Sequence, residues 1–550
     1  MSEAKKLIIN GNMNNFNGNI QQINKEKIVI YNEESSNKNI DDESSNKITK
    51  ALNYFIYFNS ILLIFVKFGA IKFIYSLLFP IYKDTLIPLL NSSKYSNIHN
   101  FKENFEVFPN YQVPGNEIQE CKLYDPFKAF KIRFEQKPID ICRSKKSSHV
   151  CYLNNIRHFV SKNGMICKME NFVIDPSKWK SDGLTYQLGP LNIQNRGCPI
   201  LKNGFFNMKC GEIEMKNIKN IKYNKLYNVY FNSWNYNYND IKEEELSPGK
   251  IVFFISRNQD SPNLYFGGAG IINAISMMYY FRLNPEQIQV VFLESMRLDN
   301  DPYYDFYKYL ISRGGEPIHI RDLHKKYHIS KAIHVPINWD SPCFILFGNA
   351  PKCKYQAKAF FYLNEFINKF MNIPNFIEPL TYDNETFYYP KSVVEPNSEK
   401  YTKFVTFQWR KAWPKGRKGQ GRLIGNGPEM IEKLAEVLPK NILIRLVDTA
   451  SLSYKEQISI MRKTDYYIGV HGAGLFLSVF MPKTSILHEI SLKKKTNNLL
   501  LMSNLSGHKT FSDIWNAKVQ NLDGSQYVYF DPNEVAKSVL NHMNSSNFFN

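Results

Sequence analysis

The 550-residue chain lacks the short motifs that mark several large protein classes. Its eight cysteines include no Cys-x-x-Cys pair, so the usual ligand spacing of a structural zinc site is absent and no metal site is expected. No Gly-x-Gly-x-x-Gly follows a strand-like segment with an acidic residue about twenty positions later, which argues against a nicotinamide-dependent oxidoreductase. Helix-turn-helix, zinc-finger and RNA-recognition patterns are also missing, so the formal charge of +19 does not indicate nucleic-acid binding. We assign that charge to a basic surface that favours anionic partners such as nucleotide diphosphates.

The composition is that of a folded protein with more than one core. Hydrophobic residues make up 43% of the chain and aromatic residues 15%, which excludes wholesale disorder. A chain of 550 residues exceeds one ordinary hydrophobic core, so two or three folding units are expected.

The cysteines lie entirely after residue 100 and are even in number. Together with a membrane-like N-terminal segment, this favours disulfides formed in an oxidising lumen. Buried free thiols in a cytosolic protein are the alternative. The positions are Cys121, Cys142, Cys151, Cys167, Cys198, Cys210, Cys343 and Cys353.

The N-terminal region indicates a membrane anchor. Residues 1–50 are polar and rich in Asn and Ser, as in a disordered tail. Residues 51–82 are apolar and long enough to cross a bilayer, and residues 83–115 would form a stem. Lys67 and Lys72 interrupt the apolar segment, so an amphipathic helix lying in the membrane interface is the alternative to a span.

The flanking charges and sequons set the expected orientation. Lys47 and Lys50 precede the apolar segment, which favours a cytoplasmic N-terminus and a single-pass type II protein of the Golgi or endoplasmic reticulum membrane. The catalytic part would then be lumenal. Four Asn-x-Ser/Thr sequons agree with that orientation, and none precedes the apolar segment. They begin at Asn91, Asn384, Asn504 and Asn544.

From about residue 250 the chain alternates strand-like and helix-like segments, which predicts a doubly wound α/β fold. We expect an N-terminal α/β domain over 116–390, whose first part is β-rich and irregular, and a C-terminal domain over 391–545. The first domain carries a predicted strand at 250–256, a glycine turn at 266–270 and a helix at 271–282. Further predicted elements are strands at 289–293, 317–320 and 332–336 and helices at 303–313 and 356–372. The second domain has predicted strands at 403–409, 441–447, 466–470 and 484–490 and helices at 428–438 and 453–462.

The most informative stretch is the segment 466–490. A strand at 466–470 leads into His471-Gly472-Ala473-Gly474 and then into an apolar helix at 475–480. Glycine permits a sharp turn and a close approach to a ligand, and a helix that starts there points N–H groups at an anion. The strand at 484–490 delivers Glu489 to the same sheet edge, where ligands of open α/β sheets bind.

A basic loop follows the strand at 403–409 and contains no acidic residue. Because that strand and the strand at 466–470 end at one sheet edge, the loop should face the His471 turn. Arg supplies planar, permanently charged donors, so we select Arg410 and Arg422 as diphosphate contacts. The basic residues of the loop are Arg410, Lys411, Lys415, Arg417, Lys418 and Arg422.

These elements, in this order, resemble glycosyltransferase family 61. The family includes the EGF-domain O-GlcNAc transferase, the protein O-mannose β-1,4-N-acetylglucosaminyltransferase and plant xylan arabinosyl- and xylosyltransferases. The resemblance is carried by Arg410, the run 421–426, the run 465–475, the Phe-Met-Pro at 480–482 and Glu489. It is strong over about 400–495, thinner over 250–355 and absent before about 240.

The resemblance implies a GT-B fold, with two Rossmann-like domains facing a cleft and a UDP-sugar bound mainly by the C-terminal one. The expected reaction is transfer of a GlcNAc, xylose or arabinose unit to a hydroxyl of a glycan or glycoprotein, with inversion and without a required metal. Arg410, Arg422 and Asn426 would hold the diphosphate and fix its loop. His471 with Gly472, Ala473 and Gly474 would stabilise the departing nucleotide. Glu489 would accept hydrogen bonds from ribose hydroxyls.

One departure from the family pattern bears on catalysis. Phe266 and Gly270 stand where family members often carry His and Asp after the first strand. An inverting transfer needs a base for the acceptor hydroxyl. The candidates are His471, Glu294, Asp299, Asp301 and Asp305, and the alternative is a catalytically impaired protein that binds nucleotide sugar or glycan. Asp299-Asn300-Asp301 is interpreted as a polar loop rather than as a metal-binding motif.

Overall fold

The computed structural model describes residues 5–7, 30–32, 124–144, 147–153, 165–180, 200–210, 212–213, 230–239, 242–256, 263–293, 303–336, 341–343, 356–379, 385–411, 423–492, 498–522 and 525–549. The chain divides into the units Met1–Ser96 and Asn97–Asn550. In the first unit, β1 (Lys5–Leu7) pairs antiparallel with β2 (Ile30–Asn32). Among the described helices none is both long and apolar enough to cross a membrane. The predicted apolar segment 51–82 and stem 83–115 lie outside the described residues.

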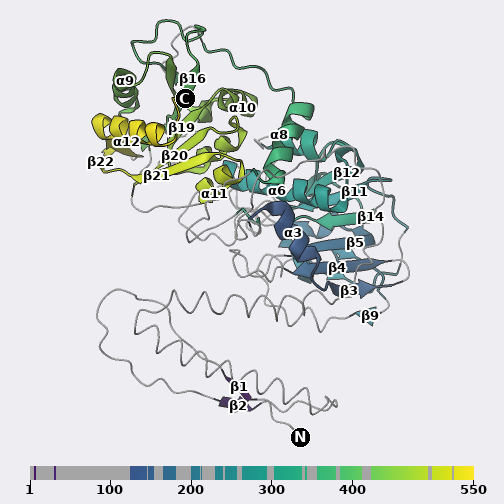
Figure 1. Ribbon diagram of the computed structural model, residues 1–550. Coiled ribbons are helices and arrows are strands. Elements are labelled where there is room, and N and C mark those ends of the chain that lie inside the picture. The colour runs from purple at the N-terminus through teal and green to yellow at the C-terminus, as the bar shows by residue number, and fades with distance from the viewer. Residues whose placement is uncertain are drawn as a thin grey trace. The chain divides into compact units, whose positions relative to one another are not determined.

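The first large sheet of the second unit has a parallel core (Figure 1). Its order is β13-β12-β11-β14, and each neighbouring pair is parallel. Alternate residues of β11 enter two hydrophobic clusters, so the strand is covered on both faces, as buried parallel strands are. The bounds are β11 Ile251–Ile255, β12 Ile288–Phe292, β13 Ile318–His319 and β14 Tyr327–His334.

Antiparallel strands extend this sheet beyond β14 in the order β5-β4-β3-β9. The strand β8 also pairs antiparallel with β5, and β10 pairs parallel with β8. The region predicted only as β-rich therefore belongs to the same sheet as the parallel strands. The bounds are β3 Ile139–Arg143, β4 Ser148–Leu153, β5 Met165–Ile174, β8 Phe206–Asn207, β9 Glu212–Ile213 and β10 Trp234–Asn235. A separate pair joins β6 (Trp179–Lys180) to β7 (Ile200–Leu201).

Two disulfides lie in this antiparallel part. Cys142 is bonded to Cys210, and Cys151 on β4 is bonded to its register partner Cys167 on β5. The expected disulfides are thus present for four of the eight cysteines. Cys343 is a buried free thiol. Cys121, Cys198 and Cys353 lie outside the described residues.

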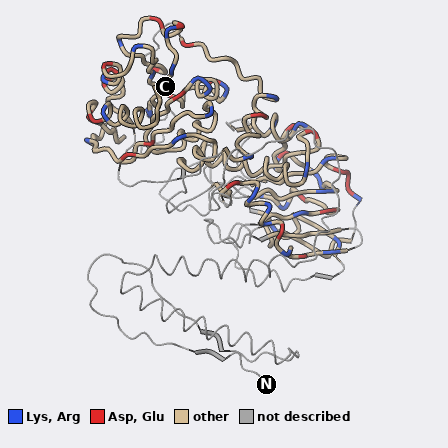
Figure 2. Tube along the Cα trace, in the orientation of Figure 1, with Lys and Arg blue, Asp and Glu red and all other residues tan. Residues whose placement is uncertain are grey.

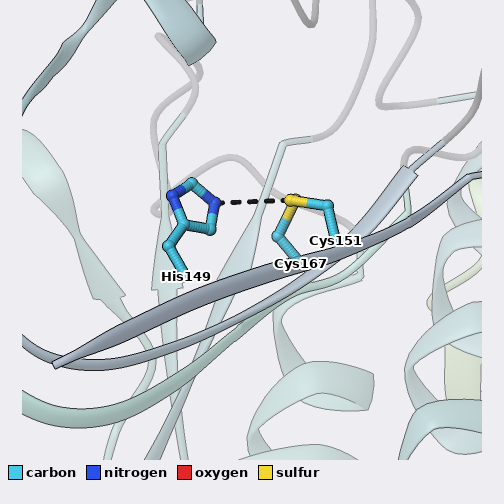
Figure 3. A group of neighbouring side chains, drawn as sticks. All are labelled: His149, Cys151 and Cys167. Atoms are coloured by element: carbon cyan, nitrogen blue, oxygen red, sulfur yellow. Dashed lines mark hydrogen bonds between the residues drawn. A yellow bond between two sulfur atoms is a disulfide. The ribbon is translucent and has the colours of Figure 1, made fainter. Parts of the chain in front are cut away.

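A buried histidine lies against the second disulfide. Figure 3 shows the His149 ring directed at Cys151, with 3.4 Å between Nε2 and Sγ. Burial lowers the pKa of His149 to about 3, so the ring is neutral at physiological pH. Because both sulfur atoms are joined in the disulfide, they are not thiolates, and this group is a packing arrangement rather than a metal site.

The glycine turn predicted at 266–270 is wrong, because these residues lie inside a helix. The helix α6 spans Leu264–Phe281, and Asn263 caps its N-terminus through a hydrogen bond from the Tyr265 N–H. A Cβ at Gly267 would overlap the Tyr303 ring, and one at Gly268 would overlap the Phe476 ring. The glycines therefore allow helix packing. They make no turn.

Three further helices and one π-helical turn accompany the first sheet. The helices α3 (Pro126–Phe134) and α8 (Lys358–Phe370) pack with α6 in one hydrophobic cluster. The predicted helix at 303–313 is split into α7 (Tyr304–Phe306) and the π-helical η5 (Tyr307–Ile311). Single 3₁₀ turns lie at η2 Pro176–Lys178, η3 Pro285–Gln287 and η6 Ile320–Asp322.

The second sheet has the order β15-β18-β16-β19-β20-β21, and all its neighbouring pairs are parallel except β15 with β18. The strands predicted at 403–409, 441–447 and 466–470 are confirmed to within about one residue. The bounds are β15 Phe387–Tyr388, β16 Lys403–Gln408, β18 Ile442–Val447, β19 Tyr466–Val470, β20 Ile486–Ser491 and β21 Lys509–Ile514.

Helices cover both faces of this second sheet (Figure 1). The helices α9 (Gly427–Val437) and α12 (Pro532–Ser545) pack together on one face. On the other face lie α10 (Tyr454–Arg462), the 3₁₀ helix η9 (Ala473–Phe480) and α11 (Asn498–Leu505). Because Ser453 and Glu456 form a capping box, α10 begins where the sequence predicted it. The 3₁₀ turn η8 is Thr449–Ser451, and a small sheet joins β17 (Leu423–Ile424), β23 (Ser525–Phe530) and β22 (Ala517–Leu522).

A buried ion pair fixes the segment that connects the two sheets. Arg445 on β18 and Glu378 in the connecting segment are both buried, and the guanidinium donates to the carboxylate. Arg445 also donates to Thr406 on β16, and Tyr389 donates to Glu378. The connecting segment is thus held on the second sheet by buried, partnered charges.

Candidate functional site

The order of the second sheet creates one position where a ligand crevice is expected. The chain runs from β16 to β18 on one side and then crosses to β19 on the other side of β16. The intervening helices α9 and α10 lie on opposite faces. In open α/β sheets the ligand binds outside the carboxyl ends of the strands where the order reverses. Here that position lies between the ends of β16 and β19.

The segment after β19 is the predicted glycine turn. The His471 N–H donates to the Ile490 carbonyl at 2.8 Å, so the parallel ladder continues through this residue. Gly472 is extended, with φ 170°, and η9 begins directly after it. The predicted apolar helix is therefore a 3₁₀ helix. The Tyr467 hydroxyl stabilises the turn by donating a hydrogen bond to the Gly474 carbonyl at 3.2 Å.

Both glycines of this turn allow a close approach of polar side chains. A Cβ at Gly472 would overlap the Arg410 guanidinium, and a Cβ at Gly474 would overlap the Gln408 amide. Arg410 donates to the His471 carbonyl at 3.4 Å. The residues at the ends of β16 and β19 are thus brought together, as the sequence predicted for Arg410 and the turn.

His471 is held by a buried carboxylate. Its Nδ1 lies 3.1 Å from Oε1 of Glu489, whose side chain is fully buried on the neighbouring strand β20. Ser491 donates to the same oxygen at 3.1 Å. The His471 side chain is 26% exposed. With Nδ1 facing the carboxylate, the ring orientation is fixed, and Nε2 lies on the opposite edge of the ring.

This arrangement gives Glu489 a partner that the sequence did not predict. Its ribose-binding role remains a prediction, since the contact seen is with His471 and Ser491. The buried carboxylate and the Ser491 hydroxyl therefore fix the position of the imidazole beside the turn.

Most of the predicted basic loop lies outside the described residues, including Arg422 and every residue from 412 to 422. Lys411 is described, and its ammonium lies 3.8 Å from the centre of the Trp409 ring. It also donates to the Glu385 carbonyl. Lys411 is therefore engaged by the connecting segment, while Arg410 faces the His471 turn.

The Asn426 side chain joins the start of α9 to β23. Its amide donates to the Phe530 carbonyl at 2.7 Å and accepts from the Phe530 N–H at 3.1 Å. That Asn426 fixes the diphosphate loop and contacts the diphosphate remains a prediction, because residues 412–422 lie outside the described part of the chain.

Sequence reasoning missed two polar residues of the site. Gln408 is buried at the end of β16, and its amide donates to Thr449 Oγ1 at 3.1 Å. Thr449 follows β18, so polar groups come from the ends of three adjacent strands. Their position at the ends of apolar strands was the available signal, since that edge carries ligands in α/β sheets.

Apart from His471, none of the predicted catalytic bases is brought to this site within the described part of the chain. Glu294, Asp299 and Asp301 lie outside it. Asp305 is described and is exposed on α7. Phe266 is half-buried on α6, and a Cβ at Gly270 would lie 3.0 Å from the Tyr307 hydroxyl oxygen. His471 is the one candidate base or acid that the structure positions at the strand ends among the residues described.

Two of the four predicted glycosylation sites are described. Asn544 is exposed on α12. Asn504 is buried on α11, and its amide oxygen accepts from Thr510 at 2.9 Å. A glycan on Asn504 would therefore require α11 to open, which argues against this site. Asn91 and Asn384 lie outside the described residues.

The charge distribution agrees with a scattered basic surface. Figure 2 shows Lys and Arg mixed with Asp and Glu over the described parts of the chain, with long uncharged runs between them. Over the described residues the basic side chains are therefore distributed, and Arg410 places a positive charge beside the His471 turn.

Comparison with known proteins agrees with this geometry. No curated protein matches the chain. The family model of Glycosyltransferase 61 matches residues 320–487, a range that includes Arg410 and the His471 turn and ends two residues before Glu489. The segment 320–487 is therefore a glycosyltransferase family 61 region, and this match supports a glycosyltransferase enzyme.

Proposed function

We propose that this enzyme transfers a sugar from a UDP-sugar to a hydroxyl of a glycan or glycoprotein, with the donor diphosphate bound between the ends of β16 and β19. The sugar would be of the GlcNAc, xylose or arabinose class, and the transfer would invert the anomeric centre. The observation that carries the proposal is the meeting of Arg410 with the His471 turn at the point where the strand order reverses.

The roles follow from the chemistry of each group. Arg410 supplies a charge that persists at every physiological pH and suits a phosphate oxygen. The first N–H groups of η9 add donors in the same direction. His471, held through Nδ1 by Glu489, offers Nε2 to the diphosphate. As the glycosidic bond breaks, negative charge grows on the diphosphate, and these donors stabilise it in the transition state.

The arrangement of domains and the cellular site are part of the proposal. The two α/β sheets support a GT-B arrangement, with the second sheet on the donor side. We further propose a type II protein anchored through residues 51–82, with its catalytic part in the lumen of the Golgi or endoplasmic reticulum. The disulfides Cys142–Cys210 and Cys151–Cys167 support an oxidising compartment.

Donor turnover and UDP affinity test the catalytic proposal. The full-length protein, purified in detergent, is expected to release UDP from at least one of the common UDP-sugars. In the Arg410→Ala variant, UDP affinity should fall by about 10- to 150-fold, which corresponds to roughly 1.5–3 kcal/mol for a charge-assisted hydrogen bond. Arg143→Ala is the matched control, because that side chain is 68% exposed on β3.

The outcomes separate the proposal from its alternative. UDP binding without release from any donor would favour a protein that binds nucleotide sugar without turnover. Equal UDP affinity in the wild type and Arg410→Ala would contradict the proposed position of the diphosphate between the ends of β16 and β19. Arg422→Ala is expected to weaken UDP binding to a similar extent, and His471→Ala should lower turnover more than stability.

Topology is tested separately in cells. A type II anchor predicts that the protein stays in the membrane after carbonate extraction and that protease added to intact microsomes removes only the N-terminal tail. Release into the soluble fraction, or digestion of the C-terminal part, would contradict the proposed location without affecting the catalytic proposal.

A further inference from the structure

Three side chains converge on the face of the second sheet opposite the donor site. His488 on β20, Asp513 on β21 and His542 on α12 place their ligand atoms within 4.8 Å of one another. The Nε2 atoms of His488 and His542 lie 3.1 Å and 2.9 Å from the same oxygen, Oδ2 of Asp513. Both imidazoles are thus aimed at one point.

The strand register explains why this group forms away from the donor site. Neighbouring side chains of a strand point to opposite faces, so His488 and Glu489 face in opposite directions. Ile486 and Ile490 belong to the core beneath α12, which places His488 on that side. Glu489 instead contacts His471. His488, Asp513 and His542 therefore lie on the opposite face of the sheet from the donor site and form a separate group.

Surrounding side chains fix the two rings. The Tyr466 hydroxyl lies 3.1 Å from Nδ1 of His488, which leaves Nε2 directed at Asp513. The Trp515 ring packs edge-on against His488, at 5.5 Å between centroids. The Phe511 ring stacks on His542 at 4.2 Å. Such partners on the distal nitrogen and the ring faces are what holds a ligand histidine in place.

We propose that His488, Asp513 and His542 bind a divalent transition-metal ion of the zinc type. Two imidazole nitrogens and one carboxylate oxygen form a ligand set that suits zinc. Two ligands about 2.1 Å from a shared tetrahedral ion are roughly 3.4 Å apart, so the observed spacing needs only small shifts. The Asp513 and His542 side chains are 26% and 23% exposed, so water can complete the coordination sphere.

The ion would act on the fold, because its ligands come from three separate elements. It would link β20 and β21 to α12, the helix at the C-terminal end of the described chain. Metal binding to the folded state alone adds to stability and couples to folding. The effect would then be seen in the unfolding of the protein rather than in the specificity of the transfer.

The alternative to a bound metal ion is a network of hydrogen bonds among the same side chains. Both imidazoles can donate to Asp513, and Ser538 donates to the same Oδ2. That network places three donors on one carboxylate oxygen. A metal ion would replace the two imidazole donors and leave Ser538 as a support for the carboxylate. The two states differ in metal content, which can be measured directly.

The test uses the full-length protein stripped with a chelator and then titrated with ZnCl₂. We expect the wild type to retain one zinc per chain at this site, and its cobalt derivative to show the intense visible absorption of a four-coordinate ion. His542→Ala and the isosteric Asp513→Asn should each weaken zinc binding by more than about 100-fold, since loss of a ligand exceeds loss of an outer-shell partner. His324→Ala, which removes an exposed histidine elsewhere, is the matched control.

Thermal unfolding supplies a second readout. At a free zinc concentration about a hundred times the Kd, the wild type and His324→Ala should unfold roughly 5 °C higher than in chelator, and the two ligand variants should not. Binding of zinc to the ligand variants with unchanged stoichiometry and affinity would overturn the proposal. So would the absence of retained zinc in the wild type. Circular dichroism of each variant in chelator establishes that a loss of zinc is not a loss of fold.

Discussion

Two glycine-rich segments of this protein follow parallel strands, and they serve opposite purposes. Gly267 and Gly268 lie inside α6, where a Cβ would overlap an aromatic ring. Gly472 and Gly474 lie at the start of η9, where a Cβ would overlap the polar ends of Arg410 and Gln408. The first segment permits helix packing and the second permits polar groups to gather at the strand ends. The group that faces a glycine, rather than the glycine itself, decides its function.

The two segments also meet each other. Phe476 belongs to η9, the helix that the second segment begins, and its ring fills the space left by Gly268 on α6. Leu475 and Leu477 of η9 belong to the same hydrophobic cluster as Ile271 and Ile275 of α6. The packing of the first segment therefore supports the helix on which the donor site depends.

The largest expected effect is on the packing segment. Gly268→Ala adds a methyl group against a rigid ring, so the free energy of unfolding should fall by about 1–3 kcal/mol despite the better helix propensity of Ala. Urea unfolding of the full-length protein measures the change. Adding Phe476→Leu should recover part of the loss, because it removes the obstructing ring. Unchanged stability in Gly268→Ala would show that α6 and η9 do not need this close approach.

The next effect is on the site segment and should appear in binding. Gly474→Ala meets the end of the flexible Gln408 side chain, which can rotate away at small cost. We expect UDP affinity to fall about tenfold, or roughly 1.4 kcal/mol, with a smaller change in stability. Calorimetric titration with UDP measures this. If Gly268→Ala weakened UDP binding of the folded protein more than Gly474→Ala did, the assignment of packing to the first segment and binding to the second would be wrong.

The third comparison concerns the slope of stability against pH and one buried histidine from each sheet. Burial lowers the pKa of His334 on β14 to about 4 and that of His508 before β21 also to about 4. Below pH 6.5 the unfolded chain binds protons that the folded protein excludes, so stability falls as the pH is lowered from 6.5 towards 4. Each histidine contributes at most about 1.4 kcal/mol per pH unit.

Variants at the two positions test this symmetry. His334→Asn and His508→Asn should each reduce the slope of stability against pH between 6.5 and 4, and by similar amounts. Urea unfolding at several pH values gives the slopes. A slope that changes in only one variant would mean that burial does not act equally on the two sheets.

The second sheet was predictable because its strands are buried on both faces. Such strands are continuous apolar runs bounded by polar residues, and β16, β18 and β19 were located to within about one residue from that signal. The start of α10 followed from the Ser453 cap, which is also a local signal. Arg410 and the His471 turn were paired correctly because both follow parallel strands.

Other features depended on contacts between distant segments. Glycines at 266–270 indicate a turn as readily as a helix, and only the rings of Tyr303 and Phe476 distinguish the two. The antiparallel strands join the parallel part through β5, which pairs with residues of β14 more than a hundred positions away, so the sequence signalled β-structure but not their sheet. Gln408 and Thr449 were missed because neither residue type marks a site until the strand ends are adjacent.

The amino-acid sequence alone determined the α/β class, the positions of the buried parallel strands, the family resemblance and the glycine turn at 471–474. Periodicity and local capping act over a few residues, and the sequence records them directly. Only the tertiary structure decided that Glu489 supports His471, that the earlier glycines pack against rings, and that His488, Asp513 and His542 share one point. Each of these depends on strand order and register, which bring together side chains that are far apart along the chain.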